Sequence, residues 1–286
     1  MLTKMMFTIR IKRLICVLLL FMALGGHAAS QIVNRKATPN PSGTVSFDIQ
    51  TARLKPNFQG NDPQAILNAL VERKKKLARD EFETTASYNS RVEALNSMPY
   101  LGGLTVDSHL AFVLPEKSVA FRYDADKGLF IATIQLETIV GCSPYNLKIG
   151  SVDCKFLTVR ENTIQNKTYT GQNTFGAKTP VLDMSVENIG LDFYAVGTIP
   201  PQDPEQQIYR SSFPSKESLA KSIKPNLRAM VVGKLSKLGY SEVKYTRTPT
   251  LEAPVKIQTT YRHLHFIMQR ICFFNNASGE IYGCLQ

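Results

Sequence analysis

The chain has 286 residues, no tryptophan, and 34 Lys and Arg against 23 Asp and Glu, which gives a formal net charge of +11. Its 15 Phe and 11 Tyr are enough for a substantial hydrophobic core, so disulfides would supplement that core and not replace it. The charge is basic without being extreme. A nucleic-acid partner is not expected, because such proteins present a basic stripe interleaved with stacking aromatic residues.

Residues 1–28 have the organisation of a secretory signal peptide. Four cations without an acid precede an apolar run of 11 residues at 14–24, and small residues surround Ala28, where we expect cleavage. The alternative, a retained membrane anchor, is disfavoured because the run is well short of the roughly 20 residues that span a bilayer. We therefore expect a bacterial periplasmic or secreted protein with no transmembrane segment after signal removal.

Removal of the signal leaves 30 Lys and Arg against 23 acidic residues, a net charge of +7 on residues 29–286. An envelope protein with this charge is suited to an anionic polymer, an anionic lipid surface or an acidic partner protein. Solubility alone explains the charge equally well.

The first part of the mature chain is expected to be a polar leader at 29–62 followed by two helices. Residues 44–49 alternate at period two, which predicts a short strand. Asp62 followed by Pro63 is a typical helix start, and apolar residues then recur at helical spacing. A second helix is predicted to begin at Thr84 or Thr85, so a helical segment near 63–96 would turn near Phe82.

The region that follows is predicted to be β-structure. The expected strands lie at 109–114, 118–123, 129–140, 152–160, 181–187 and 191–197. The Pro-rich stretch at 199–204 is the strongest linker candidate. It would divide a domain at 63–198, containing the helices and these strands, from a C-terminal α+β domain at 205–286.

The C-terminal block is expected to begin with a short helix capped by Ser215. Residues 227–235 are compatible with a helix or a strand, and their β-branched residues and Gly233 favour a strand. A long strand is predicted at 261–274, a turn at 275–279 and a returning strand at 280–285. The predicted fold class is α+β, rich in antiparallel strands, with two local disulfide-stapled hairpins.

Four cysteines follow the signal, in two pairs of equal spacing: Cys142 with Cys154, and Cys272 with Cys284. Four cysteines allow three connectivities, and local pairing is favoured because each pair brackets a turn-rich segment. A thiol redox centre would need a Cys-x-x-Cys arrangement, and a zinc site would need shorter spacing. The repeated spacing leaves open whether a β-unit is duplicated or the similarity is a coincidence.

Two histidines alternate on the predicted strand at 261–274. His263 and His265 would point the same way, about 7 Å apart at the backbone, which suits two metal ligands or two polar residues on a solvated sheet face. His109 is distant in the sequence, and no third ligand is identifiable. We therefore expect no metal site, with these two residues as weak candidates.

A second weak metal signal is Asp124-x-Asp126-x-Gly128, which is similar to the opening of a calcium loop. The glutamate required at the twelfth position is replaced by Gln135. A hairpin turn explains the Asp and Gly residues equally well.

The sequence contains no nucleophile elbow, zinc-protease helix, phosphate loop or dinucleotide fingerprint. No cofactor is therefore expected, and a catalytic site would have to be assembled in space. The strongest candidate for partner binding is a basic cluster on the first helix, formed by Arg73, Lys74, Lys75, Lys76 and Arg79. It indicates contact with anionic lipid or an acidic partner, or simply a solvated helix face.

Three segments carry a resemblance to known proteins. Residues 80–91 read DEFETTASYNSR, residues 169–177 read YTGQNTFGA and residues 279–282 read GEIY. They resemble segments of bacterial exported proteins of unknown function, which implies export and a bacterial source but no activity. We expect a non-enzymatic envelope protein that binds a partner protein or an anionic surface component. The alternative is a periplasmic hydrolase with a spatially assembled, histidine-containing site.

Overall fold

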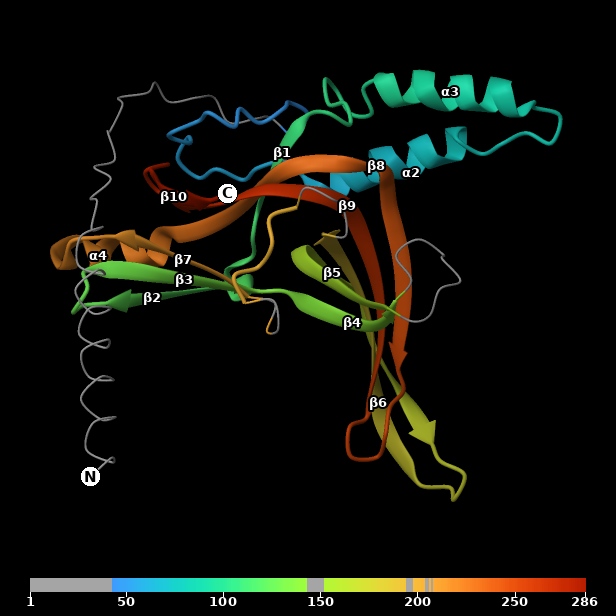
Figure 1. Cartoon of the computed structure of the whole chain (residues 1–286). Helices are drawn as coiled ribbons and strands as arrows, with labels where there is room; N and C mark the ends of the chain where they lie inside the picture. Colours follow the sequence, from blue (N-terminus) through green and yellow to red (C-terminus); the bar gives the residue numbers. More distant parts are fainter. Residues whose placement is uncertain (1–42, 143–151, 194–197, 204–205, 207) are drawn as a thin grey trace, which may run out of the picture. The chain divides into compact units, whose positions relative to one another are not determined.

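The computed structural model describes residues 43–142, 152–193, 198–203, 206 and 208–286. The described residues form one compact unit, built from two sheets, a pair of long helices and a shorter third helix (Figure 1). The predicted signal peptide lies outside the described residues. Among those described, no helix is long and apolar enough to span a bilayer.

The larger sheet has seven strands and is mixed (Figure 1). In sheet order its strands are β1 (His109–Val113), β8 (Leu227–Arg247), β9 (Val255–Asn275), β6 (Lys178–Asp192), β5 (Val152–Gln172) and β4 (Glu137–Cys142), and β10 (Ile281–Leu285) also pairs with β9. All pairs are antiparallel except β6 with β9, which is parallel. The predicted α+β fold rich in antiparallel strands is confirmed, and β6 with β9 is the parallel exception among the described strands. Parallel neighbours need a long crossover, and here the chain between β6 and β9 contains a strand of the second sheet, a helix and β8.

The second sheet has three antiparallel strands, β2 (Val119–Asp124), β3 (Leu129–Gln135) and β7 (Ile208–Pro214). Phe213 links the two sheets, since its ring centre lies 5.5 Å from that of Phe130 and 6.1 Å from that of Phe273 on β9. The single strand predicted at 129–140 is divided at Leu136, which is buried. Its two halves, β3 and β4, belong to different sheets.

Strands β5, β6, β8 and β9 are longer than predicted and form an arm that extends past the core (Figure 1). The added residues of β5, at 161–172, are mostly Thr, Asn, Gln and Lys and are largely exposed. A strand that is polar on both faces has no period-two alternation of hydrophobicity, so the sequence pattern did not reveal it.

Both long helices begin where the sequence predicts. Helix α2 (Pro63–Lys76) is capped by Asp62, whose Oδ1 accepts from Gln64 N at 2.9 Å, and α3 (Thr85–Ser97) is capped by Thr84 through a 3.2 Å bond from Ser87 N. Helix α2 buries Ile66, Leu67 and Leu70, whereas α3 buries none of its residues. Polar contacts, not core packing, must therefore hold α3.

Two local predictions fail. Residues 44–49 form no strand but pack as an irregular segment, with Phe47 buried and its N–H bonded to His109 O at 2.7 Å. Helix α4 (Glu217–Ile223) has Lys216, not Ser215, as its N-cap, without a side-chain cap. The Ser215 N–H instead bonds to Gly128 O at 3.0 Å, which anchors it to the turn after β2.

The predicted linker at 199–204 does not separate two sheets. Strand β7 from the predicted C-terminal domain pairs with β3, and β8 pairs with β1. Both sheets thus contain strands from both predicted segments, because the hydrophobic faces of each segment are completed only by the other.

One of the two predicted disulfides is confirmed. Cys272 and Cys284 are directly opposite on β9 and β10 and form a disulfide, and Cys272 is buried in a core cluster that also contains Phe47, Phe58 and Phe274. Cys142 and Cys154 lie on the paired strands β4 and β5, but their side chains are outside the described part of the structure.

Candidate functional site

The loop between α2 and α3, residues 77–84, is a protruding turn that we call the helical tip. Phe82 at its centre is 88% exposed, although burial of a phenylalanine side chain is energetically favourable. The contacts around it determine whether this residue is loosely held or presented in a fixed position.

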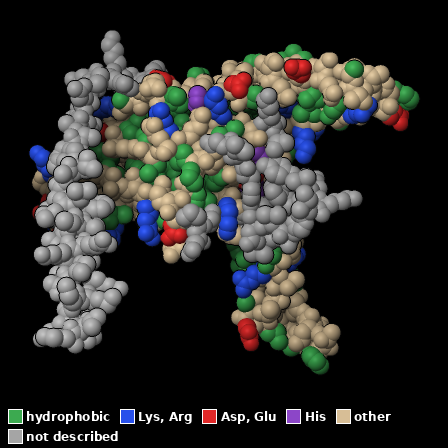
Figure 2. All heavy atoms as spheres, viewed as in Figure 1, with side chains coloured by type: hydrophobic (Ala, Val, Ile, Leu, Met, Phe, Trp, Pro, Cys, Tyr) green, Lys and Arg blue, Asp and Glu red, His purple; other side chains and the backbone are tan. Residues whose placement is uncertain are grey.

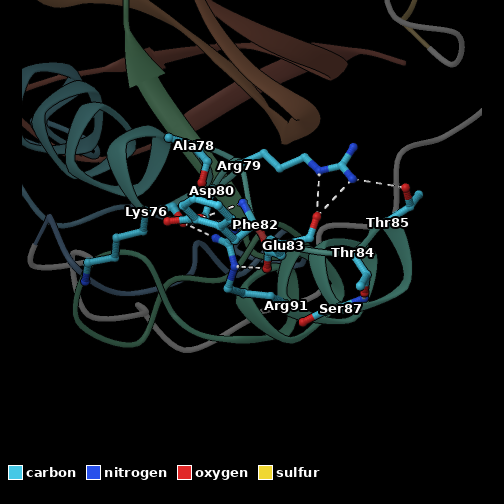
Figure 3. A network of polar contacts seen from close by, with 10 residues as sticks. All are labelled: Lys76, Ala78, Arg79, Asp80, Phe82, Glu83, Thr84, Thr85, Ser87 and Arg91. Carbon is cyan, nitrogen blue, oxygen red and sulfur yellow. Dashed lines mark hydrogen bonds and ion pairs between the residues drawn. The ribbon is translucent and has the colours of Figure 1, made fainter.

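Arg91 on α3 fixes one side of the helical tip (Figure 3). Its guanidinium binds both carboxylate oxygens of Glu83, at 2.9 and 2.6 Å, and also donates to the carbonyls of Lys76 and Ala78. The Arg91 hydrogen bond lowers the pKa of Glu83, and the same contact raises the pKa of Arg91. One arginine thereby joins the end of α2, the loop and α3.

Arg79 and Asp80 fix the other side (Figure 3). Arg79 Nη2 donates to Glu83 O at 3.0 Å and to Thr85 Oγ1 at 3.1 Å, while Asp80 Oδ1 accepts from the N–H of Phe82 at 2.9 Å. The backbone on both sides of Phe82 is thus tied to charged side chains. The exposed ring is therefore presented by a preorganised loop.

A second exposed aromatic residue is presented at the end of the strand arm. Phe175 is 94% exposed in the β5–β6 turn, residues 173–177, which we call the strand tip. Asn173 Oδ1 accepts from the N–H groups of Phe175 and Ala177, at 3.0 and 2.9 Å. Gly176 adopts φ +84°, which only glycine takes up readily. Figure 2 shows hydrophobic atoms at the far end of the otherwise mostly polar arm.

The predicted basic cluster is not a single patch. Arg73 caps the end of α3, donating to the carbonyls of Leu95 and Met98 and to Asn96 Oδ1. Lys75 pairs with Glu72 at 2.6 Å, so its charge is partly neutralised. Figure 2 likewise shows Lys and Arg scattered over the visible face and not gathered into a continuous stripe.

The other three members of the cluster have different roles. Lys74 Nζ lies 5.0 Å from the centre of the Tyr240 ring, a cation–π geometry. Lys76 is exposed and contributes its carbonyl to the Arg91 network. Arg79 belongs to the helical tip. The sequence grouped these five residues because they are close along the chain, but their separate contacts depend on where α3 and β8 lie.

The interpretation of His263 and His265 as solvated residues is wrong. They are 1% and 3% exposed, on the face of β9 opposite Leu264 and Phe266. His265 Nδ1 lies 2.5 Å from Asp192 Oδ2 on β6, where the two residues are register partners. Asp192 is 73 positions away in the sequence, so no local pattern could have identified it.

His263 is buried beside the rings of Phe156 and Tyr261, with His265 and Asp192 close enough to affect its charge. Its ring centre is 4.8 Å from that of Phe156, and its Nε2 has no hydrogen-bond partner among the described residues. Burial lowers its pKa from 6.5 to about 4, with His265 acting in the same direction and Asp192 opposing it. The imidazole is therefore neutral at physiological pH.

The metal candidates gain no support from the geometry. Within the described part of the chain, no three His, Cys, Asp or Glu residues are grouped to hold a metal ion. The segment from Asp124 to Gly128 is the β2–β3 turn, in which Asp124 Oδ1 accepts from Lys127 N at 3.2 Å and Gly128 has φ +62°. The hairpin-turn interpretation accounts for these residues.

The chain matches no protein-family model, no curated protein and no solved structure at a significant level. Its function must therefore be inferred from the geometry of its own residues.

Proposed function

We propose that the mature chain is a non-enzymatic protein of the bacterial envelope that binds a partner protein through its helical and strand tips. The observation that supports this most strongly is that two separate parts of the fold carry the same arrangement of side chains. Each tip presents a nearly fully exposed phenylalanine on a turn held by side-chain-to-backbone hydrogen bonds. Phe82 and Phe175 also lie in the segments 80–91 and 169–177, whose resemblance to exported bacterial proteins is the basis for proposing an envelope protein.

Single exposed apolar residues are common on protein surfaces and need no explanation. A phenylalanine on a preorganised turn is better suited to binding, because the turn loses little conformational entropy when it docks. Full burial of a phenylalanine contributes about 1.5–3 kcal/mol. Two such anchors could therefore support a specific complex even if the contact area around each is modest.

The charge near the strand tip indicates the partner's chemistry. Residues 162–182 contain two lysines, Lys167 and Lys178, and no acidic residue. An apolar pocket with an acidic rim would complement this surface.

The test is site-specific photo-cross-linking in the producing cells. A benzoylphenylalanine at position 82 and one at position 175 should give the same discrete adduct, while the same probe at Val45, which is 51% exposed, should not. The substitutions Phe82→Ser and Phe175→Ser should remove the adduct formed from the other tip. Unfolding by urea should be unchanged, because neither side chain is buried. Equal cross-linking from position 45, or adducts that survive the substitutions, would refute the proposal.

The hydrolase alternative has one observation in its favour, the contact between Asp192 and His265. An aspartate can orient a histidine that acts as a general base. Both side chains are buried, however, with exposures of 2% and 3%. The binding role is therefore the one that the exposed groups support.

A further inference from the structure

A cleft of about 450 Å³ lies between the α2–α3 hairpin and β8, within the range of about 300–1,000 Å³ typical of small-molecule sites. Its floor is apolar, with Leu70 and Leu235 buried. Tyr88 from α3 and Tyr240 from β8 also line it. Lys74 at its edge is exposed, so the cleft combines an apolar floor with an accessible cationic rim.

The two cations that line the cleft have no acidic partner among the described residues. Arg73 donates only to neutral oxygens at the end of α3, and burial lowers its pKa below the usual value of an arginine. Lys74 is in contact with the Tyr240 ring. By contrast, Lys75 on the same helix is paired with Glu72 at 2.6 Å.

Two acids near the cleft are already engaged. Glu83 is bound by Arg91, and Glu242, which follows Tyr240 by two residues, is bound by Arg262 at 2.9 Å and Lys244 at 3.3 Å. None of the residues lining the cleft is Asp or Glu. The lining of the cleft therefore carries positive charge and no acidic side chain beside its apolar floor.

We propose that this cleft binds a single-chain amphipathic carboxylate, with the apolar chain over Leu70 and Leu235 and the carboxylate at Lys74. The chain would bury apolar surface, and the carboxylate would gain charge-assisted hydrogen bonds from a cation that has no other acid to pair with. This site is separate from the aromatic tips and does not depend on the proposed partner protein.

Isothermal titration calorimetry of the mature chain tests this with decanoate, held below its micelle concentration, as the probe. Decanoate should bind at one site per chain. Acetate, which lacks the chain, and decyltrimethylammonium, which carries the opposite charge, should each bind at least about tenfold more weakly.

Two matched variants on α2 separate a local contact from a general charge effect. Lys74→Glu should weaken decanoate binding about tenfold, because an attraction becomes a repulsion. Lys76→Glu changes the net charge equally but lies outside the lining, and it should leave the affinity within about twofold. NMR shifts of the Leu70 and Leu235 methyl groups in the unsubstituted chain locate the ligand without any variant.

Three results would overturn the assignment. The first is equal affinity for decanoate and decyltrimethylammonium or acetate. The second is equal weakening by Lys74→Glu and Lys76→Glu. The third is binding that leaves the Leu70 and Leu235 methyl signals unmoved.

Discussion

Acid should destabilise this protein through His263 in a defined pH window. The imidazole is buried on β9 against Phe156, and its pKa falls from 6.5 to about 4. Because the folded state disfavours the charged imidazole, the unfolded chain takes up a proton at a higher pH than the folded one. Stability must therefore fall as the pH is lowered between these two values.

The magnitude follows from the two pKa values. Above pH 6.5 the imidazole is neutral in both states and has no effect on the pH dependence. Between pH 6.5 and about 4, the free energy of unfolding falls by about 1.4 kcal/mol per pH unit, or about 3 kcal/mol in total. Below the lower value both states are protonated, and this contribution stops changing.

The assay compares urea unfolding of the unsubstituted protein and His263→Asn from pH 7.5 to 4. Other titrating groups contribute to both curves, so the difference between the curves isolates His263. Over this window, the free energy of unfolding should fall by about 3 kcal/mol more for the unsubstituted chain than for the variant. This difference does not depend on how far the two stabilities differ at pH 7.5. Parallel curves would refute the neutral, desolvated state assigned to this imidazole.

Three further predictions concern the architecture. Replacing Cys272 and Cys284 together by serine should lower the free energy of unfolding in urea by about 3 kcal/mol, the chain-entropy value for a loop of this length, and an unchanged stability would contradict it. Gly279→Ala should strongly destabilise the fold in thermal unfolding, because the added Cβ would lie 1.9 Å from a backbone carbonyl oxygen. Gly239→Ala is the control, since Gly239 also has a positive φ but nothing lies within 4 Å of the added Cβ. It should cost only about 1–2 kcal/mol. Arg91→Lys should speed amide hydrogen exchange in α3 without shifting the global midpoint, since α3 buries no residue; unchanged exchange would show that the Arg91 network does not hold this helix.

The sequence located the features that depend on contacts between near neighbours. Asp62 and Thr84 cap their helices through bonds that reach two or three residues along the chain. The turn at 124–128 and the disulfide between Cys272 and Cys284 are also local. Such features are encoded within one turn or hairpin, so spacing and residue type are sufficient to predict them.

The same reasoning failed where the outcome depended on a distant segment. The parallel pairing of β6 with β9 places Asp192 beside His265, and no period or motif in either strand indicates that neighbour. The polar extensions of the strand arm were missed because their exposed surfaces show no alternation. The cleft exists only because α2 and α3 lie against β8.

By itself, the amino-acid sequence determined where the two long helices begin, where the turn at 124–128 lies and that Cys272 and Cys284 form a bridge. Only the tertiary structure decided which faces became buried, which charges remained without a partner and which aromatic residues stayed exposed. The physical reason is that burial and charge compensation are properties of surfaces brought together from distant segments, such as those of Asp62 and Arg160, 98 residues apart, whereas caps and turns are properties of a few consecutive residues.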